Sequence, residues 1–125
     1  MSAAAGHTVG TIPSTATVRV EVDGEVVAET TNAVELTETN IRNRWYVPRA
    51  DVRADALTPS DTSTHCPFKG DASYHGIRTA AGERPDLAWY YPEPIPEAEA
   101  IRDHLSFYVE KDGVEVFVDG EPAGG

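Results

Sequence analysis

Short segments in which apolar and polar residues alternate, each closed by a turn signal, recur along this sequence and constrain its fold more than any other feature. The clearest is residues 18–22, where Val18, Val20 and Val22 alternate with charged residues and Asp23-Gly24 follows. A period of two is typical of a strand with one buried face. Asp-Gly is a strong hairpin signal, because both positions tolerate positive φ angles. The pattern predicts antiparallel strands joined by tight turns.

Other segments repeat this pattern, whereas only one has a helical period. We expect strands at residues 26–30, 34–38, 44–47, 72–79, 87–91 and 114–118. One helix is expected over residues 96–109, since Pro96 suits the first position of a helix and Ile101, Leu105 and Tyr108 recur at helical spacing. The sequence therefore predicts a mainly β fold of antiparallel sheets with one C-terminal helix.

The length of 125 residues suits a single domain. Residues 1–16 are small, polar and without a period, so we expect a flexible N-terminal arm there. The domain itself is expected over residues 17–119, followed by a flexible tail over residues 120–125.

Charge and hydropathy exclude several kinds of partner. The formal net charge of −11 would repel a phosphate backbone or an anionic membrane. No apolar run approaches the roughly 20 residues of a membrane-spanning helix. The first residues lack the basic segment and apolar stretch of a secretory signal. We therefore expect a cytoplasmic protein that binds neither nucleic acid nor membrane.

The only cysteine, Cys66, lies in the segment Thr64-His65-Cys66-Pro67-Phe68-Lys69-Gly70. One cysteine cannot form an internal disulfide or a cysteine-built zinc site, so we expect no metal and no other cofactor. Cys66 is either a nucleophile activated by a nearby cation or a packed core residue. Lys69 is either a ligand for an anion or the partner of a carboxylate within the protein.

Several motifs together resemble one known family. They are Trp45-Tyr46-Val47-Pro48-Arg49-Ala50-Asp51-Val52, Cys66-Pro67-Phe68-Lys69-Gly70 followed by Ala72 and Tyr74, and Ala88-Trp89-Tyr90-Tyr91-Pro92. Their order and spacing are similar to the small bacterial and archaeal family known as domain of unknown function 427. The resemblance implies an Mss4-like, or β-tent, arrangement of two small antiparallel sheets over a cavity.

Two functional hypotheses follow. In the first, the domain binds a small molecule in the central cavity, and the ligand-binding residues are Tyr46, Cys66, Lys69, Tyr74 and Trp89. Tyrosine and tryptophan suit the wall of a pocket because they are apolar but keep one polar atom. In the second, the domain has no catalysis and is a protein-interaction or structural module, and the same residues form its core. Whether any reaction is catalysed stays open, with Cys66 as the candidate catalytic residue.

Overall fold

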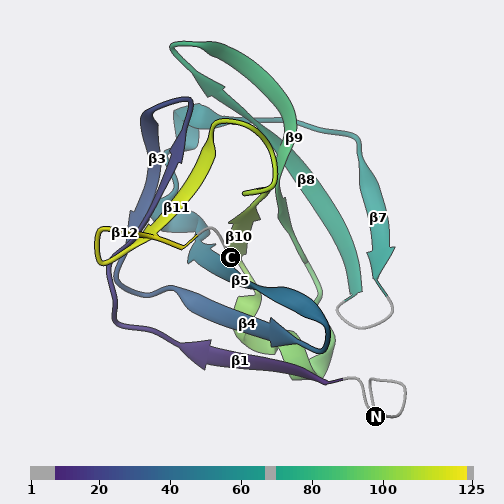
Figure 1. Cartoon of the computed structure of the whole chain (residues 1–125). Coiled ribbons are helices and arrows are strands. Elements are labelled where there is room, and N and C mark those ends of the chain that lie inside the picture. Colours follow the sequence, from purple (N-terminus) through teal and green to yellow (C-terminus); the bar gives the residue numbers. More distant parts are fainter. Residues whose placement is uncertain (1–7, 67–69, 124–125) are drawn as a thin grey trace.

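The described residues, 8–66 and 70–123 of a computed structural model, form two antiparallel sheets (Figure 1). The larger sheet has the strand order β1-β4-β5-β10-β9-β8-β6, and β7 pairs with β8. Its strands are β1 (Val9–Pro13), β4 (Val34–Glu38), β5 (Ile41–Pro48), β6 (Leu57–Thr58), β7 (Ser63–Cys66), β8 (Gly70–Thr79), β9 (Gly82–Tyr90) and β10 (His104–Phe107). The mainly β fold expected from the alternating segments is therefore confirmed.

The smaller sheet has the order β12-β11-β2-β3. Its strands are β12 (Glu121–Pro122), β11 (Val114–Val118), β2 (Val18–Val22) and β3 (Glu25–Thr30). The turn between β2 and β3 is Asp23-Gly24, and both residues have positive φ angles, 51° and 83°. The hairpin signal in the sequence thus predicted the turn that forms.

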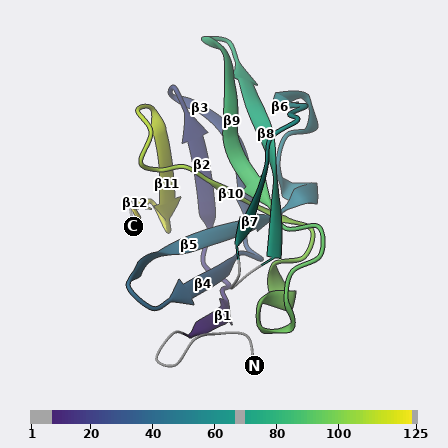
Figure 2. The same ribbon diagram turned by 90° about the vertical axis from the view of Figure 1, so that its right-hand side faces the viewer.

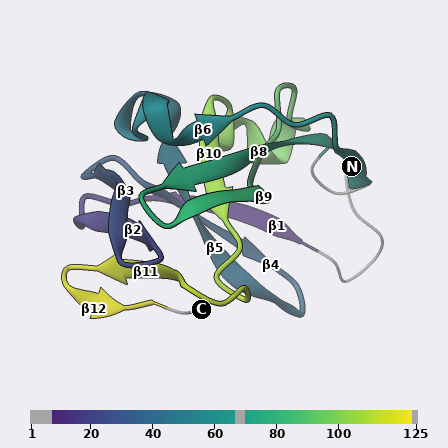
Figure 3. The same ribbon diagram turned by 90° about the horizontal axis from the view of Figure 1, so that it is seen from above.

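Three short 3-10 helices connect strands: η1 (Arg49–Asp51), η2 (Ala54–Ala56) and η3 (Pro96–Ile101). Figure 2 shows the β8–β9 hairpin standing beside the β2–β3 hairpin. Seen from above in Figure 3, β6 lies on one side of β8 and β9, and the β2–β3 hairpin lies on the other. β6 extends the larger sheet by pairing with β8, and the smaller sheet packs against the β8–β9 hairpin across the main core.

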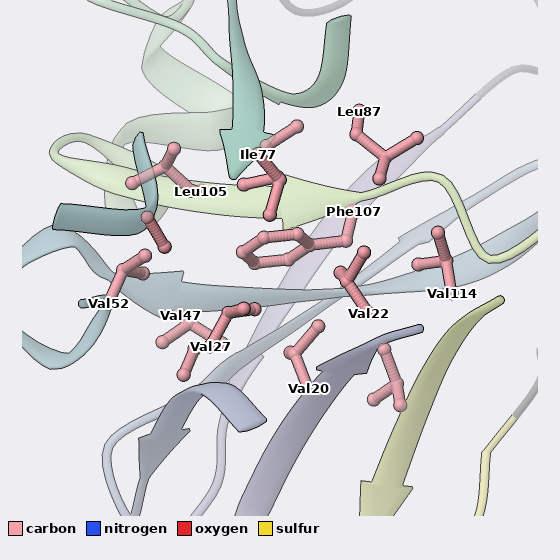
Figure 4. Close-up of a cluster of buried hydrophobic side chains, with 14 of the residues drawn as sticks. Val20, Val22, Val27, Val47, Val52, Ile77, Leu87, Leu105, Phe107 and Val114 are labelled. Carbon is pink, nitrogen blue, oxygen red and sulfur yellow. The ribbon is translucent and has the colours of Figure 1, made fainter. Parts of the chain in front are cut away.

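The main core lies between the two sheets (Figure 4). The alternating valines of the smaller sheet, including Val20 and Val22, face Ile77, Leu87 and Phe107 of the larger sheet. Val18, Val20 and Val22 are at most 1% exposed, while Arg19 and Glu21 between them are partly exposed. The period of two in the sequence therefore marks the buried face of β2.

The expected helix over residues 96–109 is wrong for most of its length. Only Pro96–Ile101 is helical, as the 3-10 helix η3, and His104–Phe107 forms strand β10. Asp103 between them has a positive φ of 60°, which ends any helix. β10 then pairs with β5 on one side and β9 on the other, so its backbone hydrogen bonds come from the sheet. Leu105 is fully buried in β10, so its apolar character reports burial and not a helical period.

Within the described residues, parts of the segments expected as an arm and a tail form short strands. Val9–Pro13, within the expected arm over residues 1–16, forms β1 and pairs along its whole length with β4. Glu121–Pro122 forms β12 against β11. The backbone pairing supplies order that the polar, aperiodic sequence does not indicate.

The finer β-tent arrangement is not confirmed, since the larger sheet runs on through eight strands. Within the described residues, no helix has both the length and the apolar character needed to cross a membrane.

Candidate functional site

The structure brings four of the five predicted ligand-binding residues into one buried group. Tyr46 from β5, Tyr74 from β8 and Trp89 from β9 belong to a single apolar cluster, and Cys66 at the end of β7 packs against it. Tyr74 and Trp89 lie directly opposite each other in the β8–β9 pair. We call this group, with Tyr91 and Tyr108, the aromatic cluster. Lys69 lies outside the described residues.

Tyr46 and Trp89 are bonded to each other at the centre of the aromatic cluster. Trp89 Nε1 donates a hydrogen bond to Tyr46 Oη at 2.9 Å, and the rings meet edge to face with centroids 6.2 Å apart. Tyr46 is 0% and Trp89 6% exposed. Burial raises the pKa of Tyr46 well above its ordinary value of 10, so its hydroxyl stays protonated. Both polar atoms are therefore occupied within the protein.

Tyr108, which sequence reasoning placed on a helix, closes the aromatic cluster. Its ring centroid lies 4.4 Å from that of Trp89, and its ring stacks on Tyr74 at 6.4 Å. Tyr108 Oη donates to Tyr74 Oη at 3.4 Å, and Tyr74 Oη and Thr64 Oγ1 are 2.8 Å apart. Burial is also the main cause that raises the pKa of Tyr108. The predicted ligand-binding residues Tyr74 and Trp89 thus pack against another aromatic ring, that of Tyr108.

Arg44 covers the outer side of the aromatic cluster. Its guanidinium carbon lies 5.1 Å from the Trp89 ring centroid, a cation–π distance. Glu110 holds Arg44 through two hydrogen bonds, one of 2.9 Å from Nη1 to Oε1 and a second from Nη2 to Oε2. These hydrogen bonds are the main reason that the pKa of Glu110 falls from 4.5 to about 2.

The Arg44–Glu110 pair predicts a pH dependence of stability. Because the folded pKa of Glu110 is about 2 and its ordinary value is 4.5, the unfolded chain binds more protons between these values. The contribution of the ionised Glu110 to the free energy of unfolding is therefore complete above pH 4.5 and is lost as the pH falls through about 2. The Glu110 side chain is 39% exposed, so solvent screening keeps the contribution below about 1 kcal/mol.

Denaturant unfolding of the parent and of Glu110→Gln, compared from about pH 6 to pH 2, measures this contribution. The difference in unfolding free energy should shrink as the pH falls. Glu115→Gln, a change at an exposed residue of β11, is the matched control and should show no such trend. A difference for Glu110→Gln that is constant across the range would contradict the assignment.

A hollow of about 350 Å³ opens beside the aromatic cluster, lined by Asp71, Ser73, Pro92 and Glu93. We call it the β8 hollow, because Asp71 and Ser73 lie on that strand. None of the predicted aromatic residues lines it. His65 Nδ1 lies 2.6 Å from Asp71 Oδ1 at its edge, and both side chains are well exposed. The hollow therefore lies outside the cluster that the sequence indicated.

Gly70 begins β8, next to Asp71 of the β8 hollow. Its φ of 112° is positive, and a Cβ there would lie 3.0 Å from the carbonyl oxygen of Glu93. The expectation that Gly70 supplies a backbone conformation closed to other residues is confirmed. The close approach also brings Gly70, at the start of β8, against the backbone of residues 93–95 after β9.

Substituting Gly70 by alanine is expected to lower the free energy of unfolding by roughly 1–2 kcal/mol from the φ angle alone, and by more from the contact with Glu93. Gly24→Ala is the matched control, since Gly24 also has a positive φ, 83°, but a Cβ there meets nothing within 4 Å. Urea unfolding of both variants should show the larger loss for Gly70→Ala. Equal losses would mean that the Glu93 carbonyl moves aside freely.

A second hollow of about 450 Å³ is lined by Thr17, Glu29, Thr30, Thr31, Asn32 and Asp51. Asp51 Oδ2 accepts a hydrogen bond of 2.6 Å from Thr30 Oγ1, and it makes no side-chain cap for η1.

In residues 8–66 and 70–123, no group of three or more His, Cys, Asp and Glu side chains is placed to hold a metal ion.

Sequence reasoning assigned no function to Arg49 or His75, yet the structure places them together on the outer face of β8. Arg49 Nη1 lies 3.0 Å from His75 Nε2, and both contact the ring of Tyr90. Arg49 belongs to the motif Trp45–Val52, but His75 lies 26 residues further along the sequence. The sequence held one indication of this position of His75, namely the alternation in β8, which puts Ser73 and His75 on the same face of the strand.

The family model described as domain of unknown function, DUF427, matches residues 11–120. The matched range contains every strand from β2 to β11 and all the residues of the aromatic cluster. A search of curated proteins found no match.

Proposed function

This chain belongs to the DUF427 family, and we propose that it is a small-molecule binding protein whose ligand occupies the β8 hollow. The observation that carries the proposal is the position of this hollow. Asp71 and Ser73 follow the Cys66–Gly70 motif directly, and Pro92 and Glu93 follow the Trp89-Tyr90-Tyr91 motif. Residues that adjoin the two most distinctive motifs of the sequence thus line one concave site.

The volume and chemistry of the β8 hollow suit a small polar ligand. About 350 Å³ lies at the lower end of the range for ligand pockets, which is roughly 300–1,000 Å³. The carboxylates of Asp71 and Glu93 accept hydrogen bonds, and the Ser73 hydroxyl both donates and accepts. A ligand that carries an amine beside hydroxyl groups complements this lining. The excess of acidic over basic residues, 21 to 10, favours such a cation further.

The packing of the aromatic cluster supports the rim of the domain, and not its centre, as the place of binding. A ligand at the centre would have to break the bond between Trp89 Nε1 and Tyr46 Oη and separate rings that are almost fully buried. Leaving buried polar atoms without partners costs about 1–3 kcal/mol each. The β8 hollow is open without any such change.

A thermal-shift screen of small amines, amino alcohols and amino sugars tests the proposal. A ligand that binds only the folded state raises the unfolding temperature progressively with its concentration. The stabilisation should be lost in Asp71→Asn combined with Glu93→Gln. It should persist in Glu97→Gln, an exposed carboxylate of η3 outside the lining. Compounds that stabilise all variants equally, or a screen without any concentration-dependent shift, would contradict the proposal.

The second candidate function, a protein-interaction module, is favoured by strand β1. Within the described residues β1 pairs only with β4, so its other edge presents backbone groups that a further strand can bind. Its residue Ile12 is 53% exposed. Sedimentation at increasing protein concentration would favour this function if the chain self-associates and Ile12→Lys abolishes the association. Sedimentation as a monomer at every concentration would exclude self-association through the β1 edge.

A further inference from the structure

We infer that Arg49, His75 and Tyr90 form a binding site for one oxyanion group, a carboxylate or a phosphate. This site goes beyond the β8 hollow, and it stands whether or not a ligand occupies that hollow. We call the three residues the Arg49 site.

Arg49 is held flat and in one orientation. Its guanidinium carbon lies 4.6 Å from the centroid of the Tyr90 ring, and its Nη1 lies 3.0 Å from His75 Nε2. The His75 ring itself stacks on Tyr90 at 5.1 Å with an interplanar angle of 19°. The backbone N–H of Arg49 donates a hydrogen bond of 2.8 Å to the carbonyl oxygen of Asp103, which fixes the start of η1. A guanidinium held in this way loses little freedom when it binds a ligand.

The hydrogen bonds of His75 show which atoms donate. The carbonyl oxygen of Thr58 lies 3.0 Å from His75 Nδ1 and can only accept, so Nδ1 carries the proton. Arg49 can only donate, so Nε2 accepts from Nη1. The imidazole is therefore neutral in this arrangement. It orients the guanidinium without cancelling its charge.

Arg49 differs from the other arginines in having no carboxylate partner in the part of the chain that the structure describes. Every other arginine lies within 4.0 Å of one: Arg19, Arg42, Arg44, Arg53, Arg78, Arg84 and Arg102. The chain has 21 acidic and 10 basic residues, so carboxylates are abundant. A half-buried arginine that uses one of its N–H donors on a neutral ring keeps the others for a ligand.

The chemistry of these free donors selects the ligand class. A guanidinium offers parallel N–H groups that match the two oxygens of a carboxylate or a phosphate. Stacking on Tyr90 and partial burial reduce competition from water, which strengthens such bonds. Tyr90 is also the strand partner of Ser73, a residue of the β8 hollow. The Arg49 site and the β8 hollow therefore share the β8–β9 pair.

NMR titration of the full chain with inorganic phosphate and, separately, with acetate tests the inference, with chloride holding the ionic strength constant. We expect saturable shifts of the His75 ring and the Tyr90 amide signals. His104, whose Nδ1 lies 2.7 Å from the carbonyl of Arg102, is an internal reference that should not shift. The anion that binds more tightly identifies the ligand group as a phosphate or a carboxylate.

Arg49→Gln should weaken binding about tenfold or more, because it removes the charge and the paired donors. Arg49→Lys should fold, keep the charge and still bind more weakly than the parent. Arg78→Gln is the matched control. Arg78 lies on β8 with His75 and has a carboxylate partner in Glu83, so this change should leave binding unchanged. Shifts that rise linearly without saturation in the parent, or equal binding by the Arg49 variants, would overturn the inference.

Discussion

Replacing Trp89 by alanine is expected to lower the free energy of unfolding by about 3–5 kcal/mol. The side chain is 6% exposed, and its ring contacts Tyr46 and Tyr108 inside the aromatic cluster while the guanidinium of Arg44 covers it. Alanine would leave a large cavity and would remove the donor to Tyr46 Oη. The loss should therefore be that of a core residue.

Urea unfolding of the parent and the variant measures this loss, with Trp45→Ala as the comparison. Trp45 is only partly buried and packs at the edge of the main core, so it should cost less. A loss below about 1 kcal/mol for Trp89→Ala would instead mean that the ring lines an open space, as the sequence-based hypothesis of a central cavity required.

Gly76→Ala is expected to destabilise the domain by about 3 kcal/mol, because no space exists for a Cβ. An added Cβ would lie 2.3 Å from Thr58 Oγ1, 3.0 Å from the carbonyl oxygen of Arg84 and 3.3 Å from Pro85 Cα. Two of these neighbours are backbone atoms of β9, which cannot move without breaking the β8–β9 pair. The expected cost is therefore at the upper end for overpacking.

The contribution of Thr58 can be separated with a double variant. Thr58 is 2% exposed, and its hydroxyl has no hydrogen-bond partner among the described atoms. Thr58→Ala should therefore recover part of the loss in Gly76→Ala, while Thr58→Ser, which keeps Oγ, should recover little. Thermal unfolding of the parent, Thr58→Ala, Gly76→Ala and the double variant gives the coupling free energy between the two positions. Additive effects of Thr58→Ala and Gly76→Ala would contradict the proposed clash.

The fold was predictable wherever one face of a strand is buried and the other is not. β2, β4 and β11 were found from alternation alone, since Val18, Val20 and Val22, Val34 and Leu36, and Val114 and Val116 are the buried residues of alternating strands. β10 was not found, because Leu105 is buried in a strand that lies between two others. Its spacing with Ile101 fits a helix equally well. Only the pairing with β5 and β9 decides between them.

The candidate site was predictable only where the family-like motifs marked its residues. The motifs indicated Tyr46, Tyr74 and Trp89, and the structure does bring these together, but as a packed cluster. The Arg49 site depends on the contact between Arg49 of η1 and His75 of β8. These segments are distant in sequence, so no local sequence pattern predicts the contact. The β8 hollow likewise depends on the approach of Glu93 to Gly70.

We propose that the domain binds its ligand at the outer rim of the β8–β9 pair and not among the buried aromatic rings. The most direct test is an NMR titration with the first compound that raises the unfolding temperature, followed at the two tryptophan indole N–H signals and at the backbone amides. We expect shifts at Asp71, Ser73 and Glu93 and an unchanged Trp89 indole signal, because that N–H stays bonded to Tyr46. A large shift of the Trp89 indole signal with unchanged amides at Asp71 and Ser73 would contradict the account and restore the central cavity.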